Sequence, residues 1–110
     1  MPYRSIATFQ ANPGEGDTFE AAYRRGAFLE RAVTNPGFVR GELLRDVADP
    51  DRFVAIAEWD SEADYAAWQA AYDTLPPEPA ETMLATLAEP PSSIVGEIRS
   101  TADRDTEVPQ

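Results

Sequence analysis

The sequence has 110 residues, with 20 Asp and Glu against nine Arg, so its formal net charge is −11 and its isoelectric point is near 4.2. This acidic balance argues against a nucleic-acid or anionic membrane partner, either of which would need a basic patch. The sequence contains no Cys, His or Lys, which excludes disulfides, thiolate and histidine catalysis, histidine-ligated haem and a lysine Schiff base.

The first half of the chain predicts a strand, a helix and the start of a second strand. Residues 3–10 alternate between two faces, as a strand does. The run Asp17-Thr18-Phe19-Glu20 has the pattern of a capping box, and apolar residues recur at helical spacing from there to Val33. Gly26 lies inside this helical stripe, and Asn35-Pro36-Gly37 ends the helix.

The second half predicts a hairpin, two helices and a last strand. Strands are expected at residues 38–47 and 52–59, joined by a turn that contains Pro50. Asp60 or Ser61 caps a helix that runs to about Tyr72, and the Pro-rich run 75–79 breaks it. A short helix at 80–88 and a strand at 92–99 follow. Residues 1–99 thus form one domain, and the polar segment 100–110 is expected to be a mobile tail.

The order of elements is that of an α+β, ferredoxin-like βαββαβ fold. It predicts a four-stranded antiparallel sheet with helices on one face, whereas the residues of the other face are mixed in polarity. A second copy of the chain is therefore expected to cover that face, giving a homodimeric α+β barrel. No apolar run approaches ~18 residues, and no basic and then apolar leader begins the chain, so we expect a cytoplasmic protein.

Aromatic residues suggest a pocket between the helices and the sheet. Trp59 shares its strand face with Ala55 and Ala57, which leaves a hollow in the floor of the sheet. Either a planar ligand occupies this hollow or aromatic side chains of the first helix fill it, namely Phe19, Tyr23 or Phe28. Tyr65, Trp68 and Tyr72 share one face of the next helix, as the wall of an apolar pocket or as ordinary core.

Charged side chains offer several roles. Arg40 and Arg45 lie on opposite faces of the second strand, so only one of them can face the helices. Either guanidinium would suit a substrate carboxylate or enolate, and the alternative is a surface ion pair. Acidic residues are abundant, but no spacing of carboxylates indicates a metal site.

Three segments carry a resemblance to a known family. They are Asn35-Pro36-Gly37-Phe38-Val39, Asp49-Pro50-Asp51-Arg52-Phe53 and Glu58-Trp59-Asp60-Ser61-Glu62-Ala63. In order and spacing they resemble the antibiotic biosynthesis monooxygenase family, over almost the whole of residues 3–99. The resemblance implies a dimeric α+β barrel and, often, a reaction that needs no cofactor and acts on a small aromatic or quinol-like molecule. Members from polyketide pathways oxidise an anthrone-type ring to a quinone with molecular oxygen.

The resemblance also assigns site residues and shows departures from the pattern. Trp59 and Tyr65 stand at the positions of the tryptophan and tyrosine that the anthrone-oxidising members use. Ala55 stands where those members have an asparagine, and no cation lies between Arg52 and Arg99, where they have an arginine. Trp68 stands where many other members have a histidine, which argues against haem degradation.

Three functions follow from these observations. The first is a cofactor-independent monooxygenase acting on an aromatic, polyketide-like small molecule. In it Trp59 donates its indole N–H to the substrate oxygen, Tyr65 hydrogen-bonds that oxygen or relays a proton, and Arg40 or Arg45 stabilises the anion. The second is a non-redox cyclase or isomerase that uses a buried carboxylate as base. Its candidate bases are Glu42, Glu58 and Glu97. The third is a non-catalytic accessory subunit with a filled pocket.

Overall fold

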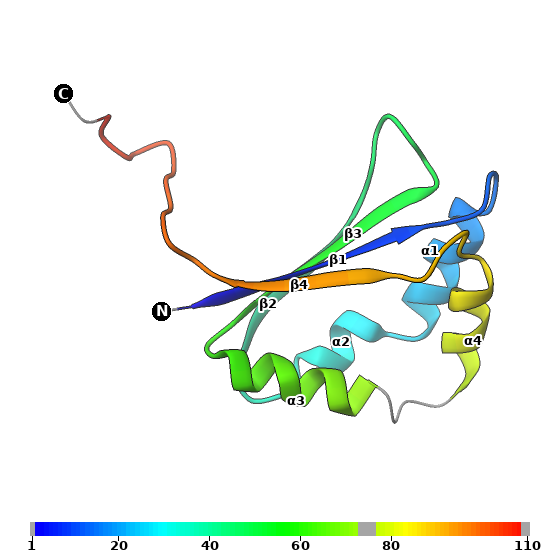
Figure 1. Ribbon diagram of the computed structural model, residues 1–110, viewed down its shortest axis with the longest axis horizontal. Coiled ribbons are helices and arrows are strands. Elements are labelled where there is room, and N and C mark those ends of the chain that lie inside the picture. Colours follow the sequence, from blue (N-terminus) through cyan, green and yellow to red (C-terminus); the bar gives the residue numbers. More distant parts are fainter. Residues whose placement is uncertain (1, 73–76, 109–110) are drawn as a thin grey trace.

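A computed structural model describes residues 2–72 and 77–108, and eight elements build this part of the chain (Figure 1). The elements are β1 (Tyr3–Gln10), α1 (Gly16–Arg25), α2 (Phe28–Ala32), β2 (Phe38–Arg45), β3 (Arg52–Trp59), α3 (Glu62–Tyr72), α4 (Pro77–Ala85) and β4 (Ser92–Glu97). The strands form one antiparallel sheet in the order β2-β3-β1-β4. This topology confirms the predicted ferredoxin-like fold.

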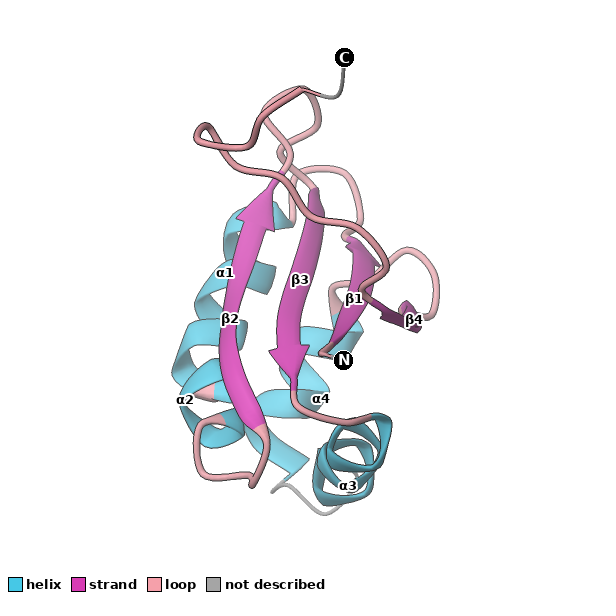
Figure 2. Cartoon of the chain, turned by 90° about the vertical axis from the view of Figure 1, so that its left-hand side faces the viewer, coloured by secondary structure: helices cyan, strands magenta, loops and turns pink. Residues whose placement is uncertain are grey.

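The helices lie on one face of the sheet, and no described element covers the other face (Figure 2). On the central strand β1, the alternate residues Tyr3, Ser5, Ala7 and Phe9 belong to the helix-covered face. The register places Ser5 opposite Ala57 of β3 and Val95 of β4. The period of two along each strand therefore determines which side chains face the helices.

A β-bulge at the start of β2 changes the faces expected for that strand. The pairing with β3 shifts between Phe38, which is opposite Trp59, and Arg40, which is opposite Glu58. Phe38 consequently shares the helix-covered face with Gly41 and Leu43, and Arg40 lies on the uncovered face. Strict alternation from Phe38 would place Arg40 on the same face as Phe38, and the extra residue of the bulge puts the two side chains on opposite faces.

The helix predicted to run to Val33 is in fact two helices. α1 ends at Arg25, and Ala27 adopts the left-handed backbone conformation, with φ of 53°, before α2 begins at Phe28. The capping box predicted at Asp17 was also wrong. The carboxylate of Asp51, in the β2–β3 turn, accepts the backbone N–H groups of Gly14 and Gly16 at 3.1 and 2.9 Å, and so binds the start of α1.

The start of α3 agrees with the prediction. The Ser61 hydroxyl oxygen accepts the backbone N–H of Asp64 at 3.1 Å and donates its own hydrogen to the Asp64 carboxylate at 2.8 Å. Gly37 precedes β2 with φ of +82°, and a Cβ atom there would collide with the Asp64 side chain. The Pro36-Gly37 pair thus allows the turn that precedes β2 to lie directly against α3.

The remaining boundaries differ from the predictions by a few residues. α4 begins at Pro77, contains a kink at Glu78 and ends at Ala85, three residues before the predicted end. The predicted helix break at 75–79 lies partly outside the described residues, at 73–76. β2 and β4 each end two residues early, and residues 98–108 contain no helix or strand.

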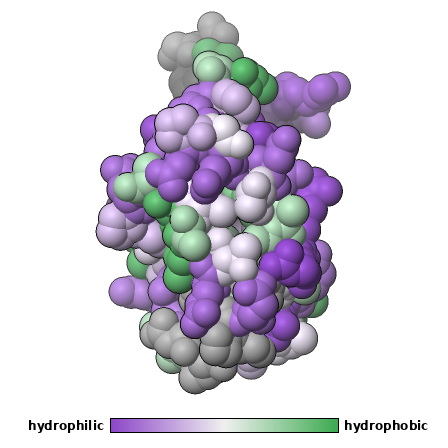
Figure 3. Space-filling view, turned by 90° about the vertical axis from the view of Figure 1, so that its right-hand side faces the viewer, coloured by the Kyte–Doolittle hydropathy of each residue, from purple (hydrophilic) through white to green (hydrophobic). Residues whose placement is uncertain are grey.

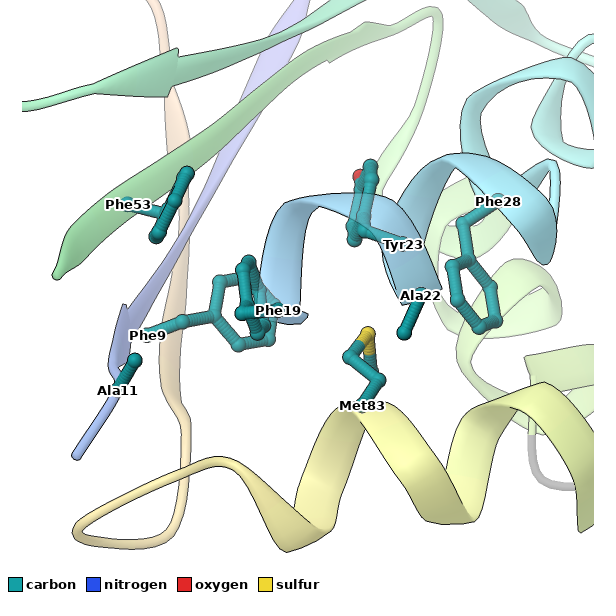
Figure 4. Packing of buried hydrophobic residues seen from close by; sticks show 8 residues of the cluster. All are labelled: Phe9, Ala11, Phe19, Ala22, Tyr23, Phe28, Phe53 and Met83. Atoms are coloured by element: carbon teal, nitrogen blue, oxygen red, sulfur yellow. The ribbon is translucent and has the colours of Figure 1, made fainter. Parts of the chain in front are cut away.

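The hydrophobic core is concentrated at one end of the sheet, under α1 and α4 (Figure 4). The Phe19 ring packs against Phe53 and Phe9 with centroid distances of 4.6 and 5.1 Å, and Met83 of α4 is fully buried beside them. The outer surface on this side of the molecule is mostly hydrophilic (Figure 3). This end is therefore packed in the way expected of a soluble α+β layer.

Candidate functional site

A cavity of about 240 Å³ lies between the sheet and helices α2 and α3. Its volume is somewhat below the roughly 300–1,000 Å³ typical of drug-sized ligand sites. The residues that line it come from all four strands and three helices: Ser5, Ala7, Phe9, Tyr23, Phe28, Leu29, Ala32, Phe38, Ala55, Ile56, Ala57, Trp59, Tyr65, Trp68, Gln69, Pro91, Ser92 and Ser93. The lining is largely apolar and aromatic, and its size suits a small planar molecule.

The cavity exists because small side chains occupy the middle of the sheet. Ala7 of β1 is paired with Ala55 of β3, and Ser5 is paired with Ala57. Trp59 stands at the end of this row, and α2 and α3 supply the opposite wall. The hollow expected beside Trp59 is therefore present, and the aromatic residues Phe19, Tyr23 and Phe28 do not fill it.

Trp59 itself is fully buried and forms part of the cavity wall. Its ring meets Phe38 and Tyr65 edge-on, with centroid distances of 5.4 and 5.8 Å. The indole N–H donates to the Ser5 hydroxyl oxygen at 3.0 Å. The predicted hydrogen bond from Trp59 to a substrate oxygen stays a prediction, and in this structure the indole N–H is donated within the protein.

Ser5 is the residue that the sequence did not reveal. Its side chain is almost completely buried on the helix-covered face of β1 and lines the cavity. The available signal was a hydroxyl on a strand face otherwise occupied by Ala7 and Phe9. That signal was too weak because β1 alternates imperfectly, and only the register with β3 shows that Ser5 meets Trp59.

The helix α3 presents Tyr65, Trp68 and Gln69 to the cavity. The Tyr65 phenol oxygen accepts a hydrogen bond from the Gln69 side-chain amide at 2.5 Å, one helical turn away. The side chain of Tyr72, the third predicted member of this face, lies outside the described part of the structure. Roles for these residues in substrate binding stay predictions.

The helices α1 and α2 supply Tyr23 and Phe28. Both line the cavity and also belong to the packed core, and their ring centroids are 5.3 Å apart. Core packing and contact with the cavity are therefore not alternatives for these two side chains. Each ring has one side in the core and contributes another part to the cavity wall.

The two arginines predicted to bind substrate do not line the cavity. Arg40 lies on the uncovered face of the sheet, 3.7 Å from Glu58. Arg45 does face the helices, but at the packed end, where it donates to Asp17 at 2.8 Å, Glu20 at 3.4 Å and the Pro50 carbonyl at 2.7 Å. The hydrogen bond with Asp17 raises the pKa of Arg45 above its usual value. These contacts make Arg45 a structural cation.

The candidate carboxylate bases also lie away from the cavity lining described above. Glu58 is paired with Arg4 at 3.2 Å on the uncovered face, and Glu42 lies near it there. Glu97 accepts a hydrogen bond from the Tyr3 phenol at 3.4 Å, and repulsion by its carboxylate raises the pKa of Tyr3. The described cavity lining consequently contains neither a carboxylate nor a cation.

The described residues contain neither a cluster of metal ligands nor a helix that could span a membrane. Within residues 2–72 and 77–108, no group of three or more Asp, Glu, His or Cys side chains is placed to hold a metal ion. The helices in these ranges are too short or too polar to cross a lipid bilayer.

The sequence profile of the antibiotic biosynthesis monooxygenase family matches residues 2–88. The chain belongs to this family. Its structure is similar to that of SnoaB, a cofactor-independent oxygenase from Streptomyces nogalater, with 27% identity, a TM-score of 0.71 and coverage of 91% of this chain and 95% of that chain. A conserved protein from Methanosarcina mazei shares the fold alone, with a TM-score of 0.74 at 12% identity over 90% of this chain and 94% of that chain.

A second relative has a different named activity. The chain is 33% identical over 69 residues to a haem oxygenase (mycobilin-producing) from Mycobacterium tuberculosis, a match that covers 62% of this chain. The chain spans 63% of the length of that relative.

Proposed function

We propose that this protein is a cofactor-independent monooxygenase that oxidises a small, planar aromatic substrate of the anthrone or phenol type, as made in polyketide pathways. The observation that carries the proposal is the cavity: among the described residues its lining consists of aromatic side chains, alanines on the sheet and uncharged polar groups. Such a site binds a flat, neutral ring system by apolar contact and orients it with a few hydroxyl groups. The similarity to SnoaB supports the same reading.

The reaction requires little covalent chemistry from the protein. The ring methylene of an anthrone loses a proton to water at the mouth of the cavity, and the resulting anion passes one electron to molecular oxygen. The carbon radical and superoxide then combine, which forms a C–O bond and, after protonation, a hydroperoxide. Loss of the second methylene hydrogen as a proton breaks the O–O bond, so one oxygen atom becomes the new carbonyl and the other leaves as water with the two hydrogens of the methylene. The protein contributes orientation, exclusion of bulk water and stabilisation of the developing negative charge.

The other functions fit the cavity less well. A non-redox cyclase needs a base, but Glu42, Glu58 and Glu97 all lie outside the described lining. An accessory subunit would have its pocket filled by side chains. Degradation of haem, as in the mycobacterial relative, calls for a ligand to the iron, and this chain contains no His or Cys.

Oxygen consumption with an anthrone-type tricyclic phenol tests the proposal. The buffer contains a metal chelator and no added cofactor, and substrate alone measures autoxidation. We expect uptake that depends on the protein and matches quinone formation. Ala55→Leu, which fills the cavity floor, should abolish it, whereas Ala66→Leu on the exposed side of α3 should not. Equal uptake with and without the protein would refute the oxygenase assignment.

We also propose that a second copy of the chain covers the open face of the sheet. Leu44 and Ile94 are exposed there, at 46% and 67%, beside the ionic group of Arg4, Arg40 and Glu58. A face that contains apolar residues and charges of both signs can be complementary to itself. Light scattering should give twice the 12.1 kDa mass of one chain, and a monomer at micromolar concentration would refute the dimer.

A further inference from the structure

We propose that the hydroxyl of Ser5, held in place by the indole of Trp59, is the hydrogen-bond donor for the reacting oxygen of the substrate. The chemical setting rests on the proposed function, but the assignment of the donor rests on contacts within the protein. Donation of a hydrogen bond to the substrate oxygen, which the sequence suggested for Trp59, is thereby assigned to Ser5. Trp59 becomes a positioning residue that holds the Ser5 hydroxyl.

Trp59 cannot serve as the donor in this arrangement. Its side chain is fully buried, and its N–H is already donated to Ser5. An indole has a single N–H and no other donor. A direct bond from Trp59 to a substrate would therefore require the ring to leave its packing against Phe38 and Tyr65 and to break the bond to Ser5.

The hydrogen of the Ser5 hydroxyl is available to a ligand. A serine hydroxyl has one hydrogen to donate, and its oxygen accepts from Trp59 at 3.0 Å. Across residues 2–72 and 77–108, no group accepts the Ser5 hydrogen. Ser5 lines the cavity while being 7% exposed, so the cavity is the space into which this hydrogen can be donated.

The bond from Trp59 also improves Ser5 as a donor. An oxygen that accepts a hydrogen bond becomes polarised and donates its own hydrogen more strongly, above all in a site with little water. The indole cannot rotate because it is buried between Phe38 and Tyr65, so the hydroxyl is oriented before a ligand binds. Such preorganised donors stabilise a developing oxyanion without a cost of reorganisation.

Tyr65 offers a second donor beside the first. Its phenol oxygen accepts from Gln69 at 2.5 Å, which directs its hydrogen away from Gln69, and its ring meets the ring of Trp59 edge-on. Two residues that carry a hydroxyl therefore contact one indole. They supply uncharged stabilisation of a substrate oxyanion in a cavity whose described lining has no arginine.

The direct test uses 4-nitrophenol as a probe, because its phenolate absorbs visible light and its pKa can be read while it is bound. Loss of a hydrogen bond to a charged oxygen should weaken binding of the phenolate about tenfold or more, and binding of the neutral phenol much less. We therefore expect Ser5→Ala to raise the pKa of the bound probe by about one unit. Thr8→Val, which removes a hydroxyl from the uncovered face of the same strand and outside the described cavity lining, is the matched control and should leave it unchanged.

A double-mutant comparison tests the link to Trp59. If Trp59 acts through Ser5, then Trp59→Phe should raise the probe pKa in the wild-type background and have no further effect on Ser5→Ala. Ser5→Thr keeps the hydroxyl, so it should leave the pKa of the bound probe close to the wild-type value. Circular dichroism checks that each variant is folded. Independent, additive effects of Ser5→Ala and Trp59→Phe would overturn the proposal.

The outcomes separate this proposal from the proposed function. A raised probe pKa in Ser5→Ala together with absent oxygen uptake supports the donor and rejects the oxygenase. Oxygen uptake with no difference between Ser5→Ala and Thr8→Val rejects the donor alone. Failure of 4-nitrophenol to bind the wild-type protein would reject the cavity as a phenol site and the donor with it.

Discussion

The two ends of the layer between helices and sheet differ in how they are filled. At the packed end, defined by Phe9, Phe19, Phe53 and Met83, aromatic rings and a methionine occupy the space under α1 and α4. At the hollow end, defined by Ser5, Ala55 and Ala57, the same strands present small residues to α2 and α3. The size of alternate residues along β1 and β3 is what separates core from cavity.

The difference has a consequence for stability and function. The packed end contributes most of the buried apolar contact, so it holds the sheet and helices together. Ion pairs reinforce it at the surface, between Arg45 and Asp17 and between Arg25 of α1 and Glu78 of α4. The hollow end is free to bind a ligand because the fold does not depend on filling it.

The largest expected effect is at the centre of the packed end. Phe19→Ala removes a fully buried ring that contacts Phe9 and Phe53. It should lower the free energy of unfolding by about 3–5 kcal/mol, measured by chemical denaturation. Val33→Ala, at a position that is 64% exposed, is the control and should change it little. A loss below about 1 kcal/mol for Phe19→Ala would mean that this end is not the core.

The same enlargement made at each end compares the two directly. Ala22→Leu places three extra carbons in the packed end, where Ala22 is fully buried, and should cost about 1–3 kcal/mol of stability. Ala55→Leu enters the cavity instead, so it should cost less than Ala22→Leu or stabilise the fold. Thermal melting of both variants gives the comparison. An equal loss at both positions would contradict a real cavity.

Substitution of two glycines tests the contact between the turn before β2 and helix α3, which forms a wall of the hollow end. Gly37 and Gly14 both have φ of +82°, but only at Gly37 would an added Cβ atom collide with another residue, the Asp64 side chain of α3. Gly14→Ala should cost about 1 kcal/mol from backbone strain alone, whereas Gly37→Ala should cost more and displace α3. Equal unfolding free energies for the two variants would show that the contact with Asp64 has no role.

The smallest expected effect is the pH dependence of the link between α1 and α4. Hydrogen bonds from Thr82, at 2.6 Å, and from Arg25 lower the pKa of Glu78 below its ordinary value of 4.5. Because the folded pKa is the lower one, the contribution to stability is present above pH 4.5 and is lost as the pH falls through the lowered value. The free energy of unfolding of Glu78→Gln should be slightly below that of wild type at neutral pH, and the two values should converge in acid. If the two proteins differ by the same free energy at every pH, this contribution of Glu78 is rejected.

Several features of the protein followed from the sequence alone. Periods of two and of 3.6, bounded by Pro and Gly, are local signals. The strands at Tyr3–Gln10 and Arg52–Trp59 and the Ser61 cap of α3 therefore agreed with expectation. The position of the cavity also followed, because small residues beside Trp59 on one strand face leave space wherever that face is covered. Shared motifs led to the family for the same reason.

Only the tertiary structure decided the chemistry of the cavity wall. A single bulge at Phe38 placed Arg40 on the uncovered face, and Asp17 and Glu20 hold Arg45 at the packed end, so no arginine joins the described lining. The hydrogen bond from Trp59 to Ser5 joins residues 54 positions apart. Strand register and long-range pairing determine such contacts, and neither leaves a periodic trace in the sequence.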